Sequence, residues 1–125
     1  MLIQLEHKDD VCIIRLKGRF AAGADAAYLR GKAEEVKTLG AQKVLADFTE
    51  VPYLDSVGIG FLIGIYTNVL QSSAGRFAII GPNERVRGVL QLTKLTGIFP
   101  AFEDEALALQ TLHSDGPAAE KAGKA

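Results

Sequence analysis

The sequence predicts an α/β fold in which a small mixed β-sheet is flanked by about four helices. Apolar residues recur with strand-like and helix-like spacing, in the order β-β-α-β-α-β-α-β-α. Turn residues separate these segments, and no internal repeat is present. The 125 residues, 48% of them apolar, suit one domain with one ordinary core. These observations imply a mixed sheet with helices packed against it.

The first expected elements are a β-hairpin and a helix. Two β-rich segments, 2–7 and 11–17, are separated by a polar turn at 8–10. Residues 25–39 predict an amphipathic helix, which Gly40 is expected to end. The apolar stripe of this helix consists of Ala26, Leu29, Ala33 and Val36.

A central strand, a loop and an uncharged helix follow. Residues 43–48 are expected to form a strand covered on both faces, because their apolar run shows no alternation with polar residues. A loop over 49–54 contains Pro52 and leads to a helix from Ser56 to about residue 73.

The last third of the chain predicts a strand, a helix, a short strand and a short helix. The first strand spans 76–80, and the helix after it begins at Asn83, a good N-cap, and runs to residue 95 with Gly97 as its stop. The short strand at 98–102 contains Pro100, which indicates a sheet edge.

The final helix is expected at 104–112, and the composition changes after it. From Ser114 onward the residues are small or polar, which predicts a disordered tail over 114–125. We therefore expect one domain over residues 1–113.

Composition and motifs argue against several function classes. The 14 Lys and Arg balance 15 Asp and Glu without a basic block, which disfavours nucleic-acid binding. Cys12 is the only cysteine and lies in an apolar run, so a buried hydrophobe is expected in place of a disulfide or zinc site. The two histidines, His7 and His113, belong to no catalytic or metal-binding motif, and Gly58-Ile59-Gly60 lacks the third glycine of a dinucleotide site. We expect no catalysis, cofactor or metal.

The segment from Ser56 to Gly75 contains twenty residues without a charge. A membrane span needs about 20 mostly apolar residues, whereas the dense apolar run here covers only 57–66. A helix buried between a sheet and a partner fits better, with 61–70 as core. The N-terminus shows no signal peptide, so a cytoplasmic location without membrane insertion is expected.

The strongest candidate site is the start of this helix. Asp55 or Ser56 can cap the first backbone amides, and capping alone would explain both residues. Gly58 and Gly60 cost a helix stability, which makes sense if another backbone or a partner approaches closely. Apolar residues that could surround an exposed Ser56 hydroxyl are Pro52, Tyr53, Leu54 and Val57. The pattern predicts a docking surface centred on Ser56.

Residues 47–60, Asp-Phe-Thr-Glu-Val-Pro-Tyr-Leu-Asp-Ser-Val-Gly-Ile-Gly, resemble the signature of the STAS domain family, found in bacterial anti-sigma factor antagonists. The resemblance extends over about residues 2–112. It includes the hairpin end at 16–20, Leu-Lys-Gly-Arg-Phe, and the Gly81-Pro82 turn before the third helix. The fold that it implies, a mixed sheet flanked by helices, agrees with the element order above.

The resemblance implies regulation by partner switching. Unphosphorylated family members bind an anti-sigma factor, a serine kinase of the GHKL ATPase type, and so free a sigma factor for transcription. The kinase phosphorylates a Ser or Thr at the head of the second helix, which ends the complex, and a PP2C-type phosphatase resets it. The matching residue here is Ser56. A non-enzymatic phosphoprotein of signal transduction is therefore expected.

Two positions depart from the family pattern. Val57 stands where a second Ser or Thr is common, and Ala21 stands where an Asp is common, although Asp25 is nearby. The stretch at 21–24 contains only alanine and glycine. It favours an alternative, in which the chain is a STAS subunit of a lipid-transport ATPase complex or a sensory signalling complex. The same surface would then be a permanent joint. The sequence leaves the oligomeric state open.

Overall fold

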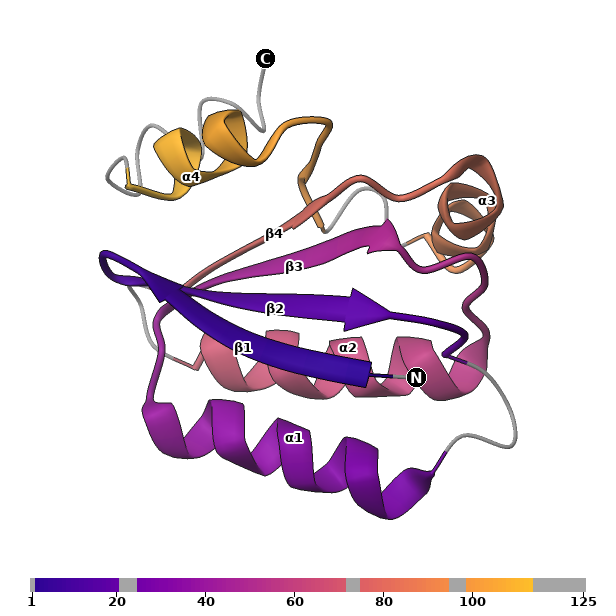
Figure 1. Cartoon of the computed structure of the whole chain (residues 1–125), viewed down its shortest axis with the longest axis horizontal. Coiled ribbons are helices and arrows are strands. Elements are labelled where there is room, and N and C mark those ends of the chain that lie inside the picture. The colour runs from indigo at the N-terminus through magenta and orange to yellow at the C-terminus, as the bar shows by residue number, and fades with distance from the viewer. Residues whose placement is uncertain (1, 21–24, 72–74, 95–98, 114–125) are drawn as a thin grey trace.

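One mixed sheet organises the computed structural model, which describes residues 2–20, 25–71, 75–94 and 99–113 (Figure 1). The sheet has the order β1-β2-β3-β4-β5. The strands are β1 (Leu2–Lys8), β2 (Val11–Lys17), β3 (Lys43–Glu50), β4 (Arg76–Ile80) and β5 (Ala101–Phe102). β1 and β2 form the antiparallel hairpin that the polar turn predicted, and the remaining neighbours pair in parallel. The predicted α/β fold with a mixed sheet is confirmed.

Helices cover both faces of the sheet. Their bounds are α1 (Ala26–Leu39), α2 (Ser56–Val69), α3 (Glu84–Leu92) and α4 (Glu105–His113). α1 and α2 lie side by side against one face, and α4 lies on the other (Figure 1). α3 packs Val86 and Leu90 into the same core as α1 and α2. This arrangement puts the first turn of α2 beside the C-terminal end of β3, a central strand of the sheet.

Alternation along the strands divides the apolar side chains between two cores. Cys12, Ile14 and Leu16 of β2 join the core under α1 and α2, whereas Val11 and Ile13 join the smaller core under α4. β3 is buried on both faces over Val44–Phe48, as its unbroken apolar run predicted. Cys12 is a buried free thiol, and burial raises its pKa.

Both ends of α1 are capped. The Asp25 carboxylate accepts a hydrogen bond from the Tyr28 amide, which begins the helix. Gly40 ends it with a φ of 65°, and its N–H donates to the Lys37 carbonyl. A left-handed residue of this kind favours glycine, so the predicted stop at Gly40 is confirmed, whereas the capping role of Asp25 was not predicted.

Some element ends differ from expectation. α2 stops at Val69, before the expected end near residue 73, and α3 stops at Leu92. β5 contains only two residues, although it is the sheet edge that Pro100 indicated. The expected helix stop at Gly97, the stretch 21–24 and the expected tail 114–125 lie outside the described residues.

α4 is held by a small apolar contact and by charges. Ala108 and Leu112 are buried against the sheet. At the first turn, the Glu105 carboxylate accepts hydrogen bonds from the Arg15 guanidinium and from Lys8 Nζ, the latter at 2.6 Å. Arg15 also pairs with Glu6 and with the buried Asp47. Arg15, with a smaller contribution from Lys8, lowers the pKa of Glu105 to about 2.

Candidate functional site

The loop after β3 is tied to the end of β2. The Phe20 amide donates to the Tyr53 carbonyl, and the Asp55 amide donates to the Phe20 carbonyl, each at 3.0 Å. Phe20 and Leu54 form an isolated parallel bridge. Because these backbone groups pair outside any regular strand, residues 51–55 approach the start of α2 along a fixed path.

Asn83 ties the same loop from the other side. Its Nδ2 donates to the Val51 and Pro52 carbonyls, both at 3.3 Å. Its Oδ1 accepts from the Val86 amide at 2.8 Å and so caps α3. The sequence predicted the cap but not the contact with the loop. No local pattern connects Asn83 with Val51 and Pro52, which precede it by 32 and 31 positions.

Asp55 is the cap of α2. Its Oδ1 accepts from the Val57 amide at 2.9 Å, and its carbonyl accepts from the Ile59 amide at 2.9 Å. Ser56 is the first residue of the helix and is exposed to solvent. The capping role therefore belongs to Asp55, and the Ser56 hydroxyl stands at the surface over the positive end of the helix dipole.

Two residues expected at the docking surface belong to the interior. Leu54 is 1% exposed, so its side chain contributes to the core and not to an exposed patch. Gly58 is buried, and a Cβ built there would lie 2.1 Å from Leu54 Cδ1 and 2.8 Å from the Phe20 carbonyl oxygen. The close approach inferred for Gly58 is real, but the neighbour is this chain's own Phe20–Leu54 bridge.

The remaining residues of the predicted surface are accessible. Pro52 and Gly60 are exposed, and Tyr53 and Val57 are half-buried beside Ser56. The Arg19 guanidinium lies 4.7 Å from the centre of the Tyr53 ring, a cation–π contact. Sequence reasoning missed Arg19 as part of this surface. The signal available was the Gly-Arg-Phe sequence directly after β2.

The uncharged helix is core on one side only. Phe61, Leu62, Ile65 and Val69 are buried, as expected for 61–70. Ile63 and Leu70, in contrast, are 40% and 42% exposed. The expectation that 61–70 is entirely core is therefore wrong, because α2 lies on the surface of the sheet and keeps one face in solvent. Among the described residues, no helix is long and apolar enough to cross a membrane.

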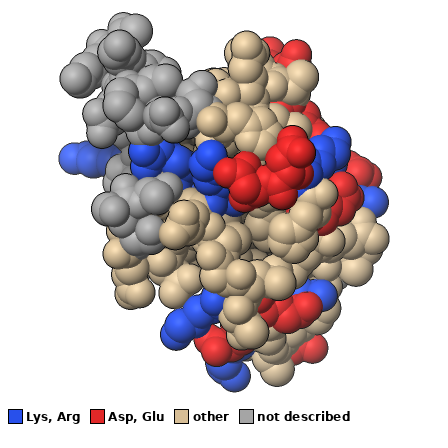
Figure 2. Space-filling model, turned by 90° about the vertical axis from the view of Figure 1, so that its left-hand side faces the viewer, with Lys and Arg blue, Asp and Glu red and all other residues tan. Residues whose placement is uncertain are grey.

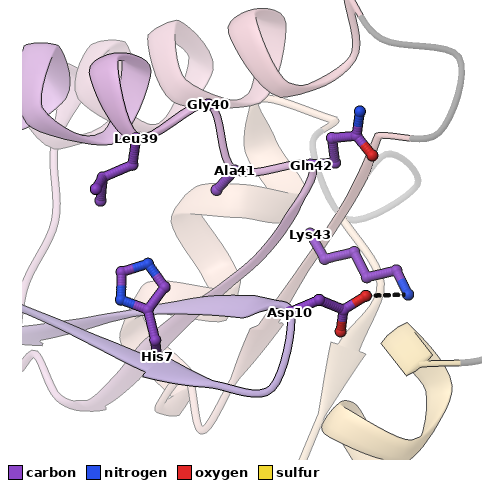
Figure 3. A pocket seen from close by; sticks show the side chains of 7 residues that line it. All are labelled: His7, Asp10, Leu39, Gly40, Ala41, Gln42 and Lys43. Atoms are coloured by element: carbon purple, nitrogen blue, oxygen red, sulfur yellow. Dashed lines mark ion pairs between the residues drawn. The ribbon is translucent and has the colours of Figure 1, made fainter.

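Charge gathers at the other end of the molecule. Figure 2 views the left-hand side of Figure 1, where acidic and basic side chains form a band across the middle of the surface. A hollow of about 300 Å³ at this end is lined by His7, Leu39 and the Asp10–Lys43 ion pair of 2.8 Å, among others (Figure 3). His113 pairs with Asp9 and Asp10 nearby. Both histidines thus belong to the charged hairpin end and not to the surroundings of Ser56.

The described residues hold no group of three or more metal-binding side chains. What the surroundings of Ser56 offer chemically is one exposed hydroxyl, a capped helix head, and a rim whose only described cation is Arg19, over the Tyr53 ring. Such a group can accept a phosphoryl group or pack against another protein.

Comparison with known proteins relates the chain to one family. The model of the STAS domain family matches residues 3–108, which is most of the chain. A protein of Paenibacillus polymyxa named anti-sigma F factor antagonist is 24% identical over 110 residues, covering 88% of this chain and 93% of its own length.

Solved structures agree with the fold. A crystal structure from Thermotoga maritima, provisionally described as an anti-sigma factor antagonist, has a TM-score of 0.81 at 24% identity and covers 90% of this chain and 95% of its own. The Bacillus cell fate determinant SpoIIAA in its phosphorylated form has a TM-score of 0.66 at 23% identity, covering 87% of this chain and 98% of its own. At these identities the likeness shows the fold alone.

Proposed function

The chain belongs to the STAS domain family, and from that premise we propose that it is an anti-sigma factor antagonist switched by phosphorylation of Ser56. Unphosphorylated, it binds a serine-kinase anti-sigma factor of the GHKL ATPase type in the cytoplasm and releases a sigma factor. Phosphorylation of Ser56 ends this complex, and a PP2C-type phosphatase restores it. The protein itself is a binding module and not an enzyme.

The observation that carries the proposal is the position of Ser56. It is exposed at the first turn of α2, beside a cap that Asp55 already provides. A kinase therefore reaches the hydroxyl without opening the helix. The name of the Paenibacillus polymyxa relative supports the partner class, and the phosphorylated SpoIIAA structure supports the modification.

The physical effect of phosphorylation follows from where the charge is added. The kinase transfers the γ-phosphoryl group of ATP to Oγ of Ser56, ADP leaves, and the hydroxyl proton passes to a base of the kinase. The product carries about −1.5 to −2 charges and three acceptor oxygens. The folded domain tolerates this group, because the N-terminus of a helix favours anions.

A partner seated on the same surface does not tolerate it. The phosphate would lie beside the Asp55 carboxylate and against a rim whose uncharged members are Pro52, Tyr53 and Val57. Covering this surface removes water from both charges, so the desolvation of the phosphate and the stronger phosphate–Asp55 repulsion in the dry contact oppose binding. A coupling of about 1–3 kcal/mol between phosphate and partner corresponds to a 5- to 150-fold change in affinity.

Substitution of Ser56 tests the proposal. Against each GHKL-type anti-sigma kinase encoded in the source genome, purified separately, Ser56→Ala should bind as tightly as the unphosphorylated protein. Ser56→Asp should bind roughly 5- to 150-fold more weakly, as measured by isothermal titration calorimetry.

Gln91→Asp, which adds the same charge at an exposed position of α3, is the control and should bind normally. Equal affinity of the Ser56 variants and the unmodified protein would indicate a constitutive joint in a larger assembly. Absence of binding to every kinase would reject the partner class.

A further inference from the structure

The exposed face of α2 forms a continuous neutral stripe that begins at Ser56. Its members are Ser56, Gly60, Ile63, Gly64, Thr67 and Leu70. Spacings of three and four residues place these positions one above another on a helix. All six are exposed, and neither α2 nor the segment to Gly75 contains a charged residue. At about 1.5 Å per residue the stripe is about 21 Å long.

Solubility alone does not account for this stripe. Exposed helix faces usually present charged residues, as α1 does with Arg30, Glu34 and Glu35. The stripe instead exposes Ile63 and Leu70, 40% and 42% accessible. A face of this composition is typical of a surface that another protein covers.

The glycines of the stripe give a second reason. A Cβ at Gly60 or Gly64 would meet no atom within 4 Å, in contrast to Gly58, which is packed against the Phe20–Leu54 bridge. Among the three glycines of α2, internal packing therefore requires only Gly58, and Gly60 and Gly64 weaken the helix without allowing any closer packing within this chain. Their absent side chains leave room for another backbone to approach α2 closely.

A hollow lies beside the C-terminal half of the stripe. It has a volume of about 270 Å³ and lies between α1 and α2. Its lining includes the charged residues Glu34 and Lys37 on α1 and Gly64, Thr67 and Asn68 on α2. The stripe and this hollow together offer a ridge and a groove of the kind that a helix from a partner occupies.

We infer that the anti-sigma factor of the proposed function covers the whole stripe from Ser56 to Leu70, and not only the first turn of α2. This inference rests on the proposed function, because the stripe is continuous with the Ser56 surface on the same helix. The occupant is a face of the same kinase that is apolar where it covers the stripe and can be polar where it meets the hollow. Phosphorylation of Ser56, at the N-terminal end of the stripe, then breaks a contact. The larger part of this contact is apolar and lies towards the C-terminal end of the stripe.

Charge placed in the middle of the stripe tests the inference while Ser56 stays intact. Ile63→Glu should weaken binding to the GHKL-type anti-sigma kinase at least tenfold, measured by calorimetry with the full chain. Leu107→Glu is the matched control, because Leu107 is 49% exposed on α4, on the opposite side of the sheet. It should bind within twofold of the unmodified protein.

Gly60→Ala separates docking from folding. Since the added methyl meets open space and alanine favours a helix, the variant should melt at a higher temperature than the unmodified protein. If the partner approaches the backbone here, the same variant should bind several-fold more weakly. A purely structural role of Gly60 cannot lower affinity while stability rises.

The outcomes distinguish this inference from the function on which it rests. If Ser56→Asp loses binding while Ile63→Glu and Gly60→Ala bind normally, the extended surface is wrong and the switch stands. If the unmodified protein binds none of the kinases, both fail. If Ile63→Glu instead converts a dimer of the unmodified protein to a monomer in light scattering, the stripe belongs to a second copy and the inference is overturned.

Discussion

Ser56 and Gly58 lie two residues apart on α2 and have opposite surroundings. Ser56 is exposed, so a group added to its hydroxyl extends into solvent. Gly58 is buried under the Phe20–Leu54 bridge, where even a methyl group finds no room. The first residue can therefore change chemically while the second fixes the loop that presents it.

Gly58→Ala tests this difference. The added Cβ would lie 2.1 Å from Leu54 Cδ1 and 2.9 Å from Phe20 Cβ, so the bridge must shift. Overpacking of this kind costs about 1–3 kcal/mol, which should exceed the gain in helix propensity. Urea unfolding should show a net loss of about 1–2 kcal/mol. A variant as stable as the unmodified protein would mean that the bridge is not rigid.

At the scale of single residues, the sequence identified Ser56 and the cap position but misjudged their neighbours. Leu54 and Tyr53 are adjacent apolar residues in a loop, and only one is buried. The difference depends on Phe20, which is 34 positions away from Leu54 and meets it through a bridge that no local pattern encodes. Sequence periodicity carries no information in a loop, so the side chains facing outward could not be separated from those facing inward.

At the scale of elements, the loop before α2 is held between two others. Backbone hydrogen bonds tie it to Phe20, and the Asn83 side chain ties it to the head of α3. The candidate surface is thus assembled by the segments that follow β2, β3 and β4, which leave the same edge of the sheet.

Asn83→Asp isolates the contribution of Asn83 to this loop. Aspartate keeps the oxygen that accepts from the Val86 amide but loses the amide donor to the Val51 and Pro52 carbonyls. We expect α3 to remain helical and the free energy of unfolding to fall by about 0.5–1.5 kcal/mol. Circular dichroism and urea unfolding measure these two effects. A loss of helix content would show that the cap itself was damaged.

α4 depends on ionised Glu105. Arg15 holds the pKa of this carboxyl at about 2, below its ordinary value of 4.5. A depressed pKa stabilises the folded state fully above pH 4.5, and the contribution disappears as the pH falls towards 2. Glu105→Gln should therefore lower stability by about 1–2 kcal/mol at pH 7, allowing for partial exposure.

The difference between Glu105→Gln and the unmodified protein should shrink between pH 4.5 and 2 in urea titrations. Glu103→Gln is the control, because the Glu103 side chain is 90% exposed and its pair with Arg87 is 3.7 Å long. It should change stability by less than about 0.5 kcal/mol at any pH. A pH-independent effect of Glu105→Gln would mean that packing, and not charge, holds α4.

Most elements could be predicted because their signals are local. The hairpin turn and the left-handed Gly40 each depend on a few adjacent residues. The end of α2 could not be predicted, since the uncharged residues after Val69 contain neither a glycine nor a proline until Gly75. The exposure of Ile63 could not be predicted either, because it depends on which side of α2 is covered by α1 and the sheet.

At the scale of the whole molecule, charged and neutral surfaces are separated. The hairpin end gathers charged side chains, among them the Asp10–Lys43 ion pair. α2, which begins at Ser56, has its first turn at the end of the molecule away from this band (Figure 1). In the proposed switch, a phosphate on Ser56 would add charge to this turn, and the partner could respond without refolding of the domain.

In the proposed function, phosphorylation of Ser56 alone releases the partner. The most direct measurement incubates the complex of this protein and its GHKL-type anti-sigma kinase with ATP, follows dissociation by native mass spectrometry, and locates the phosphate by peptide mapping. We predict one phosphoryl group on Ser56, dissociation in step with its transfer, and a Ser56→Ala complex that stays intact. A phosphorylated complex that persists, or a Ser56→Ala complex that dissociates equally with ATP, would contradict the account.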